Sequence, residues 1–333
     1  MTDFQAEKAV VRAHHAAIMN ADPSSVAEVL AQRTAPDWFW RGMHPFHEQV
    51  GAEAVARSFW APFLSAMTRV QNRPDIFMAG KDEIDGFQSV WVTSMGHFMG
   101  LFDRPFLAIQ PTGKIVMLRY VEFNKVEDGR IVETAMFFDI PHLMMQAGQN
   151  PFAPQTGAHL VQPGPATHAG LMYEVQDPAV GQKTLNAINA MLTGMGVDDG
   201  SPYAEKLART WHDDMIWWGP AGIGATYTIP RYIRQHAEPF RDALTEGYRF
   251  NGHLCRIAEG NFGGFFGWAN LTVTNAGGYI GMTAGPHAAD MRVVDMYRAH
   301  DGKLAENWIF IDILHYMNMQ GLDVLARMES LQS

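Results

Sequence analysis

Two carboxylate positions recur in the two halves of the chain, and they are the residues best suited to acid–base chemistry. Glu122 and Asp139 stand in the first half, and Asp295 and Asp312 stand 173 residues further on. All four lie in or beside strand-like segments that are largely apolar. Burial disfavours the charged form of a carboxylate and raises its pKa toward values useful for proton transfer. Asp139 and Asp312 could instead cap the short helices that follow them.

Histidines form a second candidate set. His142 and His315 each follow one of the two cap-position aspartates by three residues, where they could share a proton with it or cover the end of a domain. His44 and His47 have no counterparts in the second half, and they could transfer protons at a pocket mouth because histidine titrates near neutral pH. A metal site would need a third ligand, which this stretch lacks, so we expect no metal.

Large aromatic residues are the third set, because they either line a pocket for an apolar ligand or fill a core. The expected substrate-binding residues of the first half are Trp38, Trp40, Trp60, Tyr120 and Phe137.

The two halves differ at one position that decides where we expect the open pocket. Trp308 in the second half matches Ala135 in the first, which removes a large side chain from the inward face. We therefore expect the roomier pocket in the first half, with catalytic residues Asp139, Glu122, His44 and His47. The candidates of the second half are Asp312, Asp295, Trp308 and His315.

These residues belong to an internal repeat. Residues 127–133 and 300–306 each contain Asp-Gly followed by a charged strand start, and the match runs without a gap from Arg119 and Arg292 to the later histidines. Further upstream the offset becomes 177, as for Pro62-Phe63 and Pro239-Phe240. A period this long indicates two copies of one domain.

The Asp-Gly pairs predict two-residue β-hairpins, since both turn positions need positive φ. The flanking strands are expected at 115–126 and 130–139, and at 291–299 and 304–312. With a regular register Glu122 faces Ala135, and Asp139 faces Leu118. Glu122 and Asp139 would then share one face of the sheet.

Helices are expected before these strands in each copy, at 6–20, 24–32 and 52–67, and at 180–195, 203–211 and 229–244. Short aromatic strands are expected at 38–40 and 215–218. Helices followed by an antiparallel sheet predict an α+β domain, a cone of curled sheet with about three helices. Residues 151–176 are rich in proline and glycine and predict a linker between domains 1–150 and 177–333. We expect the two sheets to face each other as an intrachain pseudo-dimer.

The closing segment of each copy resembles the SnoaL-like polyketide cyclase family of the nuclear-transport-factor-2-like superfamily. That family's pattern is Asp-Gly, then Glu-x-Trp-x-x-x-Asp, then a short helix, and the second copy has it in full at 301–312. The first copy has Ala135 at the tryptophan position. The resemblance implies cone-shaped domains, cofactor-free acid–base chemistry, and a catalytic aspartate in or beside the closing strand. Met136 and Ile309 occupy the position directly after the tryptophan, and neither can transfer a proton.

Composition excludes several other functions. The net charge is −10 without basic blocks, which opposes binding to nucleic acid or to an anionic membrane. The one cysteine, Cys255, can form neither an internal disulfide nor a cysteine zinc site. The first residues lack a signal-peptide pattern, and no run of 18 apolar residues occurs. We expect a cytoplasmic protein that needs no cofactor and could assemble further as a homo-oligomer.

Together these features predict an enzyme that acts on a hydrophobic, oxygenated or aromatic organic substrate by cyclisation, aldol or retro-aldol cleavage, isomerisation or dehydration. The alternative is a non-catalytic small-molecule-binding or scaffold protein. An open cavity that reaches Asp139, Glu122 or His47 would favour the enzyme, and domains filled by core residues would favour the scaffold.

Overall fold

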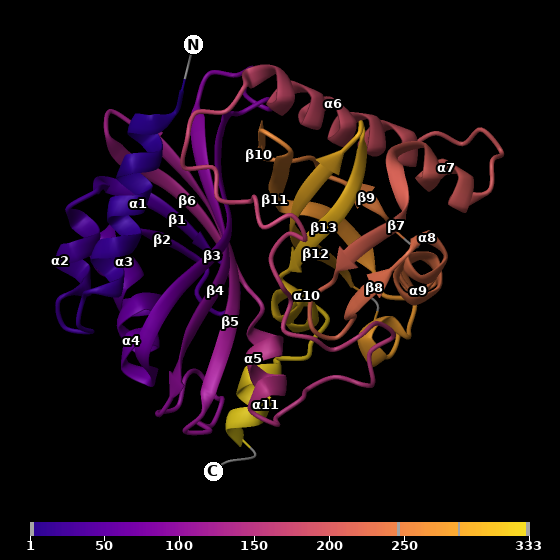
Figure 1. Cartoon of the computed structure of the whole chain (residues 1–333). Helices are drawn as coiled ribbons and strands as arrows, with labels where there is room; N and C mark the ends of the chain where they lie inside the picture. The colour runs from indigo at the N-terminus through magenta and orange to yellow at the C-terminus, as the bar shows by residue number, and fades with distance from the viewer. Residues whose placement is uncertain (1–2, 245–246, 286, 331–333) are drawn as a thin grey trace.

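Two β-sheets face each other across the middle of the molecule, and most of the helices lie on their outer sides (Figure 1). The computed structural model describes residues 3–244, 247–285 and 287–330. The chain runs through one sheet and its helices first and then repeats the same order of elements. The structure therefore consists of two tandem α+β domains, as the internal repeat predicted.

The first domain has the sheet order β2-β1-β6-β5-β4-β3. Its α1 begins the chain and buries Val11, His14 and Ile18, whose spacing places them on one helical face. The elements are α1 (Gln5–Met19), α2 (Val26–Ala31), β1 (Thr34–Gly42), β2 (Glu48–Val50), α3 (Ala52–Val55), the π-helical η1 (Ala56–Trp60), α4 (Ala61–Ala66), β3 (Met67–Lys81), β4 (Val90–Phe102), β5 (Ile115–Glu127), β6 (Arg130–Phe138) and α5 (Ile140–Gln146).

The second domain has the sheet order β10-β11-β12-β13-β7-β8, with β9 paired to β11. Its elements are α6 (Pro178–Met195), α7 (Tyr203–Thr210), β7 (Trp211–Trp218), β8 (Ala225–Tyr227), α8 (Ile229–Tyr232), the π-helical η2 (Ile233–Ala237), α9 (Glu238–Leu244), β9 (Arg249–Phe250), β10 (Cys255–Glu259), β11 (Phe262–Thr274), the 3-10 turn η3 (Tyr279–Gly281), β12 (Ala288–His300), β13 (Lys303–Ile311), α10 (Ile313–Met319) and α11 (Val324–Ser330).

The predicted helices agree with the observed ones to within two residues, although a π-helical turn interrupts the third helix of each domain. The sheets are mixed, which corrects the expectation of wholly antiparallel sheets. β1 pairs with β6 in parallel, and β7 pairs with β13 in parallel. The chain between the first and the last strand of a domain includes all of that domain's other strands. Such a long connection permits parallel pairing, which local turn signals do not reveal.

Both Asp-Gly turns have the predicted backbone, but the register of the strands beyond them was predicted wrongly. Asp128 and Gly129 have φ of 47° and 73°, and Asp301 and Gly302 have 46° and 77°. A bulge then shifts the pairing, so that Glu122 lies opposite Met136 instead of Ala135. The second hairpin carries the same shift. A β-bulge adds one residue to one strand, and side chains beyond it change face.

The bulge separates the two carboxylates that were expected to share a face. Glu122 shares the domain interior with Met136 and Phe138, while Phe137 and Asp139 are directed to the other domain. In the second domain the same shift leaves Asp295 inside and moves Trp308, Phe310 and Asp312 to the opposite face.

The domain interface is formed by the sheet faces that the bulges turn outward. Phe266 packs against Phe123 at 5.1 Å and Phe137 at 6.4 Å between ring centroids. The guanidinium of Arg119 lies 3.9 Å above the ring of Phe310 and donates to the carbonyl of Ile309 at 2.9 Å. This packing confirms the intrachain pseudo-dimer.

Two aspartates make reciprocal contacts across this interface. Asp139 caps α5 by accepting from the backbone N–H of His142 at 3.1 Å, and its other oxygen accepts from the N–H of Ala221 at 3.0 Å. Asp312 caps α10 and accepts from the N–H of His44 at 3.0 Å. His44 and Ala221 stand 177 residues apart, which is the offset of the repeat in this region. The two domains are therefore related by an approximate twofold rotation.

The segment between α5 and α6 packs over both domains. Leu171 forms a parallel bridge with Phe77 of the first domain, and Ala158 bridges Ala225 of the second. The indole N–H of Trp308 donates to the carbonyl of Pro163 at 3.1 Å. The expected linker thus adds contacts to the interface.

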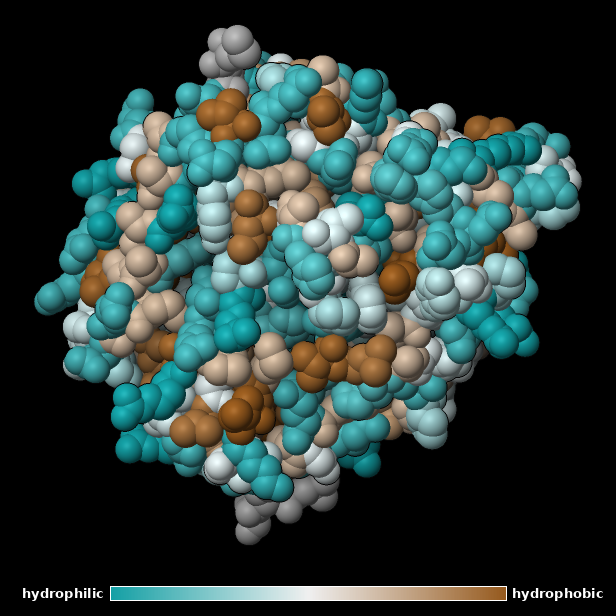
Figure 2. All heavy atoms as spheres, in the orientation of Figure 1, coloured by the Kyte–Doolittle hydropathy of each residue, from teal (hydrophilic) through white to brown (hydrophobic). Residues whose placement is uncertain are grey.

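Hydrophobic residues on the face shown in Figure 2 form small separate groups among hydrophilic ones. Among the described residues, no helix has the length and apolar character needed to span a membrane.

Removing an interface cap should destabilise the protein much more than removing an ordinary helix cap. Asp312→Ala leaves the His44 N–H and Arg292 without their buried acceptor, so the free energy of unfolding should fall by about 3–5 kcal/mol. Asp139→Ala should behave similarly. The matched control is Asp177→Ala, which removes an exposed cap that accepts only from Ala179, and it should cost about 1 kcal/mol. Equal losses in urea denaturation would contradict the interface role.

Candidate functional site

A cavity of about 590 Å³ lies in the second domain, between its helices and the inner face of its sheet. The helical wall includes Met191, Leu192 and Met195 of α6, and the sheet wall includes Val293, Ile309 and Ile311. Both walls are mainly apolar or aromatic, and polar groups enter at a few places. This combination is typical of small-molecule sites.

This cavity lies in the second domain, whereas Ala135 led us to expect the roomier cone in the first. Matched positions explain why. Tyr120 and Phe98 of the first domain stack at 4.2 Å between ring centroids. Val293 and Leu271 occupy the corresponding places, since Phe98 lies opposite Leu118 and Leu271 lies opposite Met291 in matching strands. Smaller side chains leave space that the two rings fill in the first domain.

The bulge also removes the reason for expecting space in the first domain. Ala135 pairs with Phe123, on the face that packs against the second domain, so its small side chain does not enlarge the interior. Phe138 instead projects inward and contacts Phe59 at 4.4 Å between ring centroids. Its match in the second domain is Ile311, which lines the cavity.

Asp295 is the acidic group of the cavity. Its Oδ1 accepts from the Asn307 side chain at 3.0 Å, and it also hydrogen-bonds Tyr297. Burial raises the pKa of Asp295 from its ordinary value of 3.8 to about 7, against the opposing effect of these hydrogen bonds. Near neutral pH this carboxyl therefore exists in both protonation states.

The matched carboxylate of the first domain has different surroundings. The Glu122 carboxyl group hydrogen-bonds to the ring of His15, which α1 supplies. Nearby Tyr120 donates to Asn72 at 2.7 Å and lies 2.8 Å from Ser94. In the second domain the corresponding helix, α6, presents apolar residues to the cavity instead of a histidine. Glu122 thus has a protein partner in a packed interior, whereas Asp295 borders open space.

Two histidines line the same cavity and were missed by the sequence analysis. His236 stacks on Trp217 at 3.9 Å between ring centroids, and His253 stacks on Phe265 at 3.8 Å. Burial lowers the pKa of each to about 3, so both rings are neutral at neutral pH. Tyr297 also lines the cavity, and the sequence could have indicated it. It follows Asp295 by two residues and therefore shares its face of the strand.

The histidines proposed from the first copy lie at the domain interface. His44 and His47 are 5.3 Å apart between ring centroids, and His47 lies 6.4 Å from His315. Burial lowers the pKa of His44, and it lowers the pKa of His315 to about 4. Burial also raises the pKa of Asp312 to about 6. The structure brings these residues together with one another, but not with the described cavity.

The remaining first-domain candidates are packed residues. Trp38 donates to the hydroxyl of Thr134 at 2.9 Å, Trp40 stacks on Phe59, and Trp60 contacts Phe98. All three tryptophans are at most 4% exposed. These contacts make the three tryptophans part of the packed core of the first domain.

No group of three or more His, Cys, Asp or Glu side chains is arranged to hold a metal ion within the described parts of the chain. The expectation of a cofactor-free site remains a prediction.

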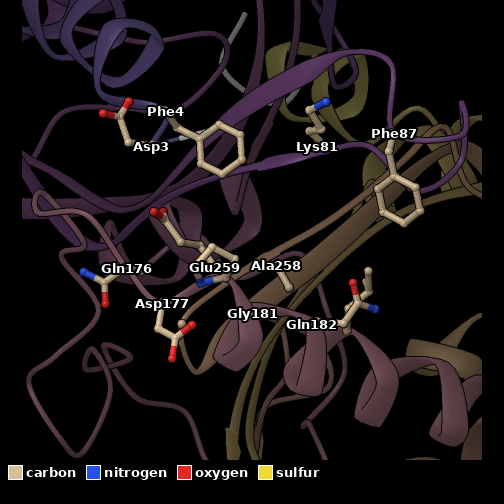
Figure 3. Close-up of a pocket in the computed structure, with 13 residues that line it drawn as sticks. Asp3, Phe4, Lys81, Phe87, Gln176, Asp177, Gly181, Gln182, Ala258 and Glu259 are labelled. Atoms are coloured by element: carbon tan, nitrogen blue, oxygen red, sulfur yellow. The ribbon is translucent and has the colours of Figure 1, made fainter. Parts of the chain in front are cut away.

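A second hollow, of about 410 Å³, lies where the N-terminal residues meet α6 and β10. Figure 3 shows Phe4 and Phe87 on either side of it, with Glu259 below. The Glu259 carboxylate accepts from Lys8 at 2.6 Å and from the N–H of Ala79 at 2.7 Å. These contacts join the domains and occupy the acidic group, so we assign no ligand to this hollow.

The pKa of Asp295 predicts a specific pH dependence of stability. The folded protein keeps this proton between about pH 4 and pH 7 while the unfolded chain loses it, so the free energy of unfolding falls as the pH rises through that window. Asp295→Asn removes this loss. The variant should gain stability relative to the parent from pH 4 to pH 7, by up to about 4 kcal/mol.

Urea denaturation at several pH values measures this difference, and Asp301→Asn, at an exposed turn, is the control that should show none. Parallel curves for Asp295→Asn and the parent would show that burial leaves the carboxyl unperturbed.

One family model and several solved structures are similar to parts of this chain. Residues 11–134 match the family model of the SnoaL-like domain. Solved structures similar to this chain include a putative SnoaL-like polyketide cyclase from Jannaschia sp. CCS1, with 21% identity, a TM-score of 0.35, and coverage of 45% of this chain and 94% of that one.

AclR, a putative hydroxylase from Streptomyces galilaeus, has 23% identity and a TM-score of 0.35, over 45% of this chain and 86% of its own. IdmH, a putative polyketide cyclase from Streptomyces antibioticus, has 18% identity and a TM-score of 0.35, over 42% and 96%. No curated protein matches the chain. Over residues 11–134 the first domain is therefore similar to the SnoaL-like domain, and the second domain repeats the same order of elements.

Proposed function

We propose that the second domain is the working domain, and that its cavity binds a hydrophobic, oxygenated organic molecule and transfers protons to and from it through Asp295. The observation that carries this proposal is a carboxyl group whose pKa burial raises to about 7, at the wall of an open apolar cavity. Perturbed carboxyl groups in cavities are characteristic of acid–base sites. The proposal moves the site from the first copy to the second.

The size and lining of the cavity indicate the class of ligand. A volume of about 590 Å³ falls within the roughly 300–1,000 Å³ of small-molecule sites. Aromatic side chains such as Trp217 and Phe265 offer flat surfaces for a ring system. Asp295, Asn307 and Tyr297 gather polar atoms at one place, which suits a carbonyl or hydroxyl oxygen on an otherwise apolar molecule.

Asp295 can act in either direction near neutral pH. As a carboxylate it can accept a proton from a carbon next to a carbonyl group, and the carboxylic acid formed can return that proton to another atom of the substrate. This balanced exchange serves isomerisation, aldol-type ring closure and dehydration without a cofactor. Burial raises the pKa of Tyr232 and Tyr297, which keeps both phenols protonated as hydrogen-bond donors.

The first domain supports the second in this proposal. Its interior is packed with stacked rings, and Glu122 is paired with His15. Asp139 spends both of its oxygens on backbone donors, one of them across the interface. We therefore assign to Asp139 the positioning of α5 and of the loop at Ala221.

The activity test uses paired substitutions. A panel of neutral bicyclic and tricyclic ketones, phenols and hydroxyketones is screened for conversion by mass spectrometry and NMR. For any compound converted, Asp295→Asn should lower kcat by roughly a hundredfold or more. Asp139→Asn keeps one of the two acceptor oxygens and removes no group from the cavity, so it should leave kcat within a few fold in folded protein. The reverse result would place the chemistry in the first domain.

Filling the cavity tests the binding site independently of turnover. The double variant Val293→Tyr, Leu271→Phe restores the two rings of the first domain and should abolish ligand binding in calorimetry. Asp295→Asn should still bind the same compound, because it keeps the apolar walls. Undiminished binding by the filled variant would place the ligand elsewhere, and binding without conversion of any compound would favour the non-catalytic alternative.

A further inference from the structure

The turn between β3 and β4 of the first domain docks against the cavity wall of the second. Asp82 accepts from the backbone N–H of Arg256 at 2.9 Å, and the N–H of Glu83 donates to the carbonyl of Arg256 at 2.9 Å. Arg256 belongs to β10 and lines the cavity. A hydrogen-bonded segment of one domain is thus held directly behind the wall of the other domain's site.

The side chains at this junction form one connected network. The Arg256 guanidinium donates from Nη1 to Glu83 at 2.9 Å and to the Asn189 side-chain oxygen at 2.7 Å. Asn189 in turn donates to the other oxygen of Glu83 at 2.7 Å. Glu83 and Arg256 are partly buried, with 23% and 17% of their side-chain surface exposed. Both Glu83 oxygens are engaged, one by Arg256 and one by Asn189, which holds the carboxylate against Nη1 of Arg256.

The far end of the network reaches a ring inside the cavity. Nη2 of Arg256 lies 2.9 Å from Nδ1 of His253. A guanidinium has donors and no acceptor, so Nδ1 must accept and the ring proton must reside on Nε2. His253 is also stacked on Phe265, which limits rotation of the ring.

We propose that Glu83 of the first domain is a positioning residue for the second-domain cavity, holding His253, through Arg256, in the tautomer that carries its proton on Nε2. The inference deepens the proposed function, since its importance rests on the cavity being the ligand site. In this tautomer His253 offers an N–H donor to a ligand oxygen, in the same cavity that Asp295 lines. The packed first domain then contributes directly to the chemistry of the second.

Loss of the Glu83 carboxylate should weaken this control. Without it, the guanidinium is held on that side only by Asn189 and can turn away from Nδ1. Hydrogen bonds to charged groups are among the stronger ones in proteins, and losing this one should change the tautomer ratio of His253 by about tenfold or more.

The experiment is ¹⁵N NMR of the full chain with labelled histidine, at neutral pH and without ligand. His253→Gln identifies the ring signals of His253. The parent should show the pyrrole-type signal at Nε2 and the pyridine-type signal at Nδ1. Glu83→Ala should shift the signals toward a tautomer mixture, and Glu83→Gln should retain most of the parent pattern because its amide oxygen still accepts.

Glu133→Ala is the matched control. Glu133 pairs with Arg41 in the first domain, and 25% of its side-chain surface is exposed. It acts electrostatically on Cys255, the residue before Arg256, but it does not hydrogen-bond to Arg256. This variant should leave the His253 signals unchanged, which separates hydrogen bonding from a general electrostatic effect.

A proton on Nδ1 in the parent would overturn the proposal, as would an unchanged His253 pattern in folded Glu83→Ala. If circular dichroism shows that Glu83→Ala is unfolded, Glu83→Asp decides in the same way, because its carboxylate is one methylene shorter and cannot reach. The tautomer readout needs no substrate, so its result stands apart from the turnover and binding tests of Asp295.

Discussion

One extra residue in the last strand of each domain decides how four carboxyl groups are divided between the domain interiors and the interface. The Asp-Gly turn sets the start of the hairpin, and the bulge beyond it shifts the pairing by one. Because side chains alternate along a strand, the shift sends Glu122 and Asp295 into the domain interiors and Asp139 and Asp312 to the interface. Of the inner pair, Asp295 borders the cavity and Glu122 lies in a packed interior, and the outer pair joins the two domains.

The two copies share this frame and differ in what fills it. Tyr120 and Phe98 close the interior of the first domain, and Val293 and Leu271 leave the second one open. Glu122 contacts the ring of His15, while burial raises the pKa of Asp295 to about 7. One copy thus has a packed core, and its sheet face and its β3–β4 turn serve the other copy. A duplicated domain can diverge in this way because a single pocket is sufficient for one ligand.

Much of the architecture could be predicted from the sequence, because it depends on local signals and on repetition. The repeat around Asp128-Gly129 and Asp301-Gly302 revealed the tandem domains, and apolar spacing located the helices. The cavity could not be placed from the sequence, because a bulge leaves no clear mark in a strand's sequence and turns the Ala135 side chain toward the interface. The contribution of Glu83 was invisible for another reason: it joins Arg256 across 173 positions of sequence, and only the folded interface brings the two together.

The titration of Asp295 shows directly whether the second domain holds an acid–base carboxyl in an open cavity. The ¹³C signal of the Asp295 carboxyl carbon, assigned by comparison with Asp295→Asn, can be followed by NMR from pH 3 to pH 9 in the full chain. We expect the Asp295 carboxyl to titrate with a midpoint near pH 7. A midpoint close to 4, the ordinary value for aspartate, would show a solvated carboxylate and contradict the assignment of this cavity as a proton-transfer site.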